Sequence, residues 1–82
     1  MNKVYKVHLF PNPSNQNLKI ISDLFTENLQ YSIQNYHGKI VASGSATIGQ
    51  QIPISEIPNG MYVMKIIEFN GSEQVLKFIK TN

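Results

Sequence analysis

Serine, histidine and aspartate, the residue types of a nucleophilic triad, all occur in this 82-residue sequence. A hydrolase of that kind needs a serine activated by a histidine, which a carboxylate orients. The sequence has seven serines, two histidines (His8 and His37) and one aspartate (Asp23). No serine lies in a G-x-S-x-G nucleophile elbow, since Gly44-Ser45-Ala46 lacks the pattern. His8 lies on the polar side of an alternating segment and His37 beside a turn glycine. We therefore expect surface histidines and assign no catalytic residue.

The residues that could hold a metal or a cofactor are spaced too widely to form a site. His8 and His37 are 29 positions apart, cysteine is absent, and Asp23 with Glu27 is too sparse for a calcium loop. The spacing of the five acidic residues brings no two of them together as an acid and a base. The five glycines form no glycine-rich loop that leads into a helix. We expect no metal, no cofactor and no enzymatic activity.

Composition and charge indicate a small folded domain without a nucleic-acid surface. The chain has eleven isoleucines and five valines, and its net charge is only +2, which argues against disorder. Its seven lysines form no run, and arginine, the preferred contact to phosphate and guanine, is absent. No stretch approaches the roughly 18 apolar residues of a membrane span. Residues 1–10 lack the apolar centre of a signal peptide, so an exported chain needs a signal elsewhere in a longer precursor, or is itself the address.

Apolar residues recur with a period of two, which predicts strands rather than helices. We expect strands at Val4–Phe10, Leu18–Ser22, Leu29–Asn35, Lys39–Ala42, Gln51–Ser55, Met61–Phe69 and Glu73–Ile79. The inward faces are expected to carry Tyr5, Val7, Leu9; Leu29, Tyr31, Ile33; Tyr62, Met64, Ile66; and Gln74, Leu76, Phe78. The segment Ser43–Gln51 is expected to be a loop or a weak edge strand, and Ser22–Leu29 is the one place for a helical turn.

Turn signals separate these strands at regular intervals. Pro11 and Pro13 end the first strand, because proline has no backbone donor. Pro53 predicts an edge or bulged strand for the same reason. Glycine-containing turns are expected at His37-Gly38, Pro58-Asn59-Gly60 and Asn70-Gly71. About seven short strands with such turns predict an all-β fold, a small antiparallel immunoglobulin-like β-sandwich.

The tyrosines leave a carbohydrate-binding alternative open. Tyr5, Tyr31, Tyr36 and Tyr62 could form a stacking platform for sugar rings. Tyr31 and Tyr62, however, share their faces with aliphatic residues, which favours core positions for both. Tyr36 is freer to be exposed, and tryptophan is absent. Asn70-Gly71-Ser72 fits the glycosylation sequon, but a hairpin turn explains Asn-Gly fully and is the preferred interpretation.

Four sequence blocks occur in a fixed order up to the carboxyl end. They are Leu9-Phe10-Pro11-Asn12-Pro13-Ser14; residues 31–41, YSIQNYHGKIV; residues 52–66, IPISEIPNGMYVMKI; and Lys77-Phe78-Ile79-Lys80. In this order and spacing, from about Val4 to Lys80, the chain closely resembles the C-terminal sorting domain of the type IX (Por) secretion system of Bacteroidetes.

The resemblance implies a non-catalytic export signal. Residues 1–82 are then a single C-terminal sorting domain, the tail of a larger secreted precursor, with an immunoglobulin-like fold. The outer-membrane translocon would recognise this folded tail. A sortase-like peptidase would cleave it from the N-terminally fused cargo. The cargo would pass through the periplasm and end at the cell surface, on lipopolysaccharide, or in the medium. The alternative is an Ig-like carbohydrate- or surface-binding module of a secreted protein.

The resemblance also implies roles for particular residues. The residues that match the sorting motifs are Pro11, Asn12, Pro13, Gly38, Lys39, Gly60, Tyr62, Lys77 and Lys80. Pro53 replaces a usually polar residue, and Gln34-Asn35 is atypical of the family. We expect the last strand to offer its lysines and Ile79 to the receptor, together with the tail. The expected receptor contacts are therefore Lys77, Ile79, Lys80, Thr81 and Asn82.

Overall fold

The computed structural model describes residues 7–11, 16–22, 28–68 and 71–81, and this part of the chain forms seven strands and no helix. The strands are β1 (Val7–Phe10), β2 (Asn17–Ser22), β3 (Leu29–Gln34), β4 (Ile40–Ala46), β5 (Gln51–Pro53), β6 (Gly60–Ile67) and β7 (Glu73–Lys80). Within these ranges no helix is long and apolar enough to cross a membrane.

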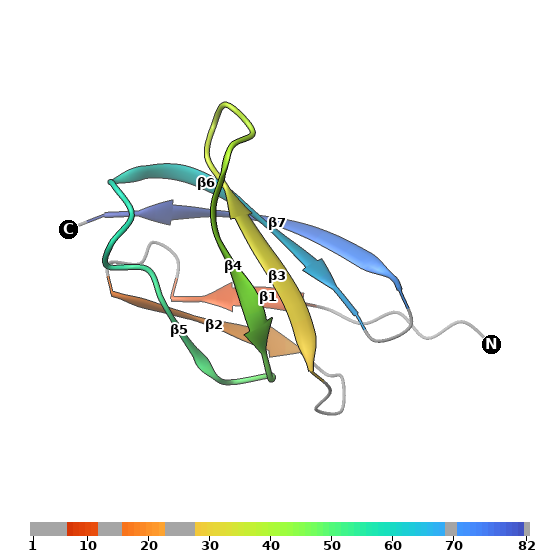
Figure 1. Cartoon of the computed structure of the whole chain (residues 1–82). Helices are drawn as coiled ribbons and strands as arrows, with labels where there is room; N and C mark the ends of the chain where they lie inside the picture. Colours follow the sequence, from red (N-terminus) through yellow and green to blue (C-terminus); the bar gives the residue numbers. More distant parts are fainter. Residues whose placement is uncertain (1–6, 12–15, 23–27, 69–70, 82) are drawn as a thin grey trace.

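The strands form two antiparallel sheets that face each other as a sandwich. The three-stranded sheet has the order β1-β2-β5, and the four-stranded sheet has the order β4-β3-β6-β7. In Figure 1, β3 and β4 cross in front of β1 and β2, so that the two layers are seen one behind the other. The predicted all-β sandwich is thus confirmed, and the pairing agrees with a period of two along each strand.

The core lies between the sheets and contains most of the residues predicted to face inward, together with others from β2, β4 and β5. The three-stranded sheet and the residue that follows it contribute Val7, Leu9, Leu18, Ile20, Ile52 and Ile54. The four-stranded sheet contributes Leu29, Ile33, Ala46, Tyr62, Met64, Ile66 and Phe78, with Tyr31 and Leu76 partly buried beside them. Tyr5 lies outside the described residues. Aliphatic side chains on both inner faces give the sandwich its main stabilisation.

Two hairpins of the four-stranded sheet share one loop geometry. In the loop after β3, Asn35 N donates to Lys39 O at 2.9 Å, and Gly38 N donates to Asn35 O at 3.0 Å. In the loop after β6, the same pair of bonds joins Glu68 with Ser72 and with Gly71. Gly38 and Gly71 have φ angles of +84° and +89°. In both three-residue loops the glycine has a left-handed backbone conformation, which agrees with the glycine-containing turns predicted at these two places. Asn70 lies outside the described residues.

The segment Ser43–Gln51, expected to be a loop or a weak edge strand, contains both: Ser43–Ala46 belong to the edge strand β4, and a turn follows. β4 continues to Ala46, because Ser43, Gly44 and Ser45 pair with β3 in unbroken register. Only the part from Thr47 onward forms a turn before β5. Pro53 ends β5, which is an edge strand as predicted. The first three residues of the expected strand Val4–Phe10, and the helical turn considered between Ser22 and Leu29 at 23–27, lie outside the described residues.

Candidate functional site

The turn at Pro58-Asn59-Gly60 starts β6 and is held by a side chain from that strand. The Tyr62 hydroxyl donates a hydrogen bond to the Pro58 carbonyl oxygen. The Tyr62 side chain is only 5% exposed. Gly60 has a φ angle of +152°, a conformation that other residues rarely adopt. Gly60 and Tyr62, two of the residues that match the sorting motifs, thus both fix the backbone at the start of β6.

The same tyrosine connects this turn to the last strand. Tyr62 and Phe78 are directly paired across β6 and β7. Their rings stack with centroids 5.5 Å apart and an interplanar angle of 22°. Aromatic pairs of this kind contribute beyond the area that they bury. The sequence block of residues 52–66 and the carboxyl-terminal block Lys77-Phe78-Ile79-Lys80 therefore pack against each other through these two rings.

The two motif lysines of β7 lie on opposite faces of the sheet. Lys77 is exposed on the outer face, whereas Lys80 is only 3% exposed and points inward, in register with Phe78. The Lys80 ammonium donates to Asn59 Oδ1 at 3.3 Å, and Lys80 pairs with Gly60 across the strands. The expected row of exposed lysines does not exist. Lys80 instead links the end of β7 to the turn that precedes β6.

The remaining motif residues lie in two different places. Gly38 and Lys39 belong to the loop after β3, where Asn35 Oδ1 accepts hydrogen bonds from His37 N at 2.9 Å and Lys39 N at 3.0 Å. Pro11 follows β1 in the other sheet, after a cis peptide bond with Phe10. Asn12 and Pro13 lie outside the described residues. Asn35 was named in the sequence analysis only as a strand end and as atypical of the family, although an asparagine three residues before a turn glycine is a recognisable signal.

An apolar patch covers the outer face of the four-stranded sheet at the end near this loop. We define the apolar patch as Tyr36, Met61, Val63 and Ile79, which surround Lys77. Tyr36, Met61 and Ile79 are 82%, 51% and 41% exposed. Met61 pairs directly with Ile79, and Val63 pairs with Lys77. A pocket of about 110 Å³ is lined by Asn35, Tyr36, Met61, Tyr62, Val63 and Lys77.

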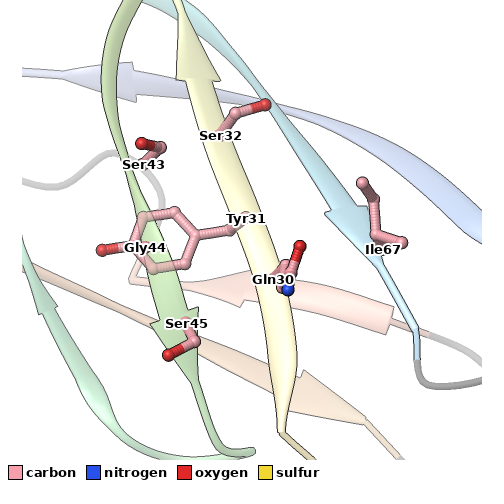
Figure 2. Close-up of a pocket in the computed structure, with 7 residues that line it drawn as sticks. All are labelled: Gln30, Tyr31, Ser32, Ser43, Gly44, Ser45 and Ile67. Atoms are coloured by element: carbon pink, nitrogen blue, oxygen red, sulfur yellow. The ribbon is translucent and has the colours of Figure 1, made fainter.

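A second hollow on this sheet has hydroxyl, amide and apolar groups in its lining (Figure 2). It has a volume of about 500 Å³ and is lined by Gln30, Tyr31, Ser32, Ser43, Gly44, Ser45 and Ile67. The Tyr31 ring lies against Gly44, where an added Cβ would stand 3.0 Å from the Tyr31 hydroxyl oxygen. The lining offers hydroxyl and amide groups and neither an acid nor a base. Such groups can form hydrogen bonds with a neutral ligand but cannot supply acid–base chemistry.

The structure does not bring the candidate catalytic types together. His8 lies on β1 in the three-stranded sheet, His37 lies in the loop after β3, and Asp23 is outside the described residues. Glu73 instead forms a surface ion pair with Lys65, with Nζ and Oε1 3.1 Å apart. Among the described residues, no group of three or more histidines and acids could hold a metal ion.

Comparison with known proteins identifies the family. Residues 8–81 match the family model of the secretion system C-terminal sorting domain. The chain belongs to this family of sorting domains. A sorting domain of this family is a type IX secretion signal, and it implies export of the attached protein to the cell surface or the medium. No curated protein matches the chain.

Proposed function

We propose that this sorting domain acts as a folded export signal and has no catalytic activity of its own. The domain is the carboxyl-terminal part of a longer precursor, and the outer-membrane translocon recognises the assembled sandwich. A sortase-like peptidase then separates it from the cargo. The family match carries the proposal. Folded recognition is supported by the burial of two motif residues, Tyr62 and Lys80, which a receptor could read only through the shape that they maintain.

We propose that the receptor contacts the outer side of β7. Lys77 and Ile79 are exposed on that face, and Thr81 is exposed just beyond the strand. The buried Lys80 side chain binds Asn59 on the inner side of the sheet, and Lys80 does not itself contact the receptor. Asn82 lies outside the described residues and keeps its predicted role in the contact. Among the motif residues, Gly38, Gly60, Tyr62 and Lys80 therefore maintain the fold. Pro11, Lys39 and Lys77 are exposed at the surface.

A fusion experiment tests this function. The 82-residue chain is fused behind a periplasm-targeted fluorescent cargo in a host with a type IX system, and surface-exposed cargo is measured. Deleting residues 78–82 is an ambiguous test, because it removes the core residue Phe78. The double variant Lys77→Glu and Ile79→Ser changes only exposed side chains. Loss of delivery by this variant, at unchanged thermal stability, supports recognition through β7. Wild-type fusions that stay in the periplasm would refute the sorting function.

A carbohydrate-binding module is the second candidate, favoured by two observations. The hollow of Figure 2 offers neutral hydrogen-bonding groups, and Tyr36 is highly exposed in the loop that follows β3 of the same sheet. Sugar binding commonly needs an exposed aromatic ring beside such groups. Tyr31, which lines the hollow, is partly buried and does not provide such a ring. A glycan array probed with the purified chain tests this function. Binding that is lost in Tyr36→Ala would favour the module over the signal.

A further inference from the structure

We infer that the apolar patch seats one apolar side chain of the export receptor, with a carboxylate of the same receptor segment beside Lys77. This inference rests on the proposed sorting function and specifies its partner chemistry. An exposed apolar cluster with a polar rim is typical of an interaction site. Here Tyr36, Met61 and Ile79 are exposed together, and the outer face of β7 that we propose as the contact continues directly into them.

The size of the pocket limits how much of a partner can enter. Its volume of about 110 Å³ lies below the roughly 150 Å³ of an apolar cavity that accepts benzene. A pocket of this size receives a single apolar side chain. The Tyr36 ring on the loop and Met61 on β6 provide walls of the pocket. Large, weakly hydrated side chains of this kind are the usual centres of binding energy in interfaces.

The charge around the pocket determines the neighbouring group. Lys77 lines the pocket, Lys39 is exposed in the loop that carries Tyr36, and none of the lining residues is acidic. The exposed acid of β7, Glu73, pairs with Ile67 at the opposite end of the sheet, near its partner Lys65. The patch therefore lies at a cationic end of the sheet. An aspartate or glutamate next to the apolar side chain matches this charge, and a lysine or arginine there would be repelled.

Matched variants in the fluorescent-cargo fusion test the patch. Tyr36→Ala and Lys77→Glu each remove one part of the proposed contact, and we expect each to lower the rate of surface delivery by about tenfold or more. Val75→Ala is the control, because Val75 lies on the same face of β7 and is 63% exposed but does not line the pocket. We expect it to change delivery by less than about twofold. Lys77→Met should lose less delivery than Lys77→Glu, since it removes attraction without adding repulsion.

Photo-crosslinking identifies the occupant. A benzophenone side chain is placed at position 36 of the fusion, and the crosslinked peptide is sequenced. The expected product is a receptor peptide with an apolar residue next to an aspartate or glutamate. A crosslink to a second copy of the domain or to lipopolysaccharide would overturn the inference, as would normal delivery of both Tyr36→Ala and Lys77→Glu. Those outcomes leave the sorting function intact as long as the wild-type fusion is delivered. If the wild type fails, the sorting function fails, and this inference fails with it.

Discussion

The hydroxyl of Tyr62 donates a hydrogen bond to the carbonyl oxygen of Pro58, four residues earlier in the chain. This is the arrangement of the tyrosine corner, in which a tyrosine near the start of a strand binds the backbone just upstream of it. Here it closes the turn that Gly60 permits and brings the ring against Phe78 of β7. One residue of the sorting motif thus connects the turn, β6 and the carboxyl-terminal strand.

Substitutions at Tyr62 should separate the hydrogen bond from the packing. Tyr62→Phe keeps the ring and leaves the Pro58 carbonyl without this donor, so we expect the free energy of unfolding to fall by about 1 kcal/mol. Tyr62→Ala also removes a buried ring, and we expect a loss of about 3–5 kcal/mol. Urea denaturation followed by circular dichroism measures both values. A loss below about 1 kcal/mol for Tyr62→Ala would contradict the buried position of this ring.

Lys80 should stabilise the domain through its buried methylene chain rather than through a surface charge. Lys80→Ala removes buried methylene groups, and we expect a loss of about 1–3 kcal/mol in the free energy of unfolding. Lys80→Met should stay within about 1 kcal/mol of wild type, because it keeps the stem and removes an ammonium that is costly to bury. Lys77→Ala, on the exposed face, should change stability by less than about 0.5 kcal/mol. Equal effects of the two alanine variants in urea denaturation would argue against the buried position of Lys80.

Gly38 should tolerate asparagine better than alanine. Its φ of +84° lies in the left-handed region, and no atom lies within 4 Å of an added Cβ, so the cost comes from the backbone alone. We expect Gly38→Ala to lower the free energy of unfolding by about 1–2 kcal/mol. Gly38→Asn should cost less, since asparagine visits this region more readily. Thermal unfolding of the two variants checks the order, and an equal or larger cost for asparagine would contradict the loop geometry.

The sequence predicted the strands and the core well, for a clear physical reason. Burial of one face imposes a period of two, and Val7, Leu9, Leu29, Ile33 and the inward residues of β6 follow it. The end of β4 was left open between a loop and a weak edge strand, because serine, glycine and alanine carry no apolar alternation. These residues are held in the sheet by their backbone pairing with β3. Tertiary pairing of this kind leaves little trace in local residue types.

The site was predicted less completely, because a lysine is normally assigned to the surface. Lys80 lies two residues beyond Phe78 in the inward series Gln74, Leu76, Phe78, so the period of two already predicts an inward position for Lys80. Its partner Asn59 lies 21 residues earlier, and only the register of β6 with β7 brings them together. The apolar patch likewise combines a loop residue with two strands, which no single segment of the sequence could indicate.

The most direct measurement of the central claim is protection of the cargo from added protease. Intact cells of a type IX host express the fluorescent cargo with the wild-type chain, with the stable surface variant Lys77→Glu/Ile79→Ser, or with no chain. We predict that external protease digests the cargo only with the wild-type chain, while the other two cargoes remain protected in the periplasm. Equal digestion in all three strains, or full protection of the wild-type fusion, would contradict a sorting signal that is read on the face of its folded last strand.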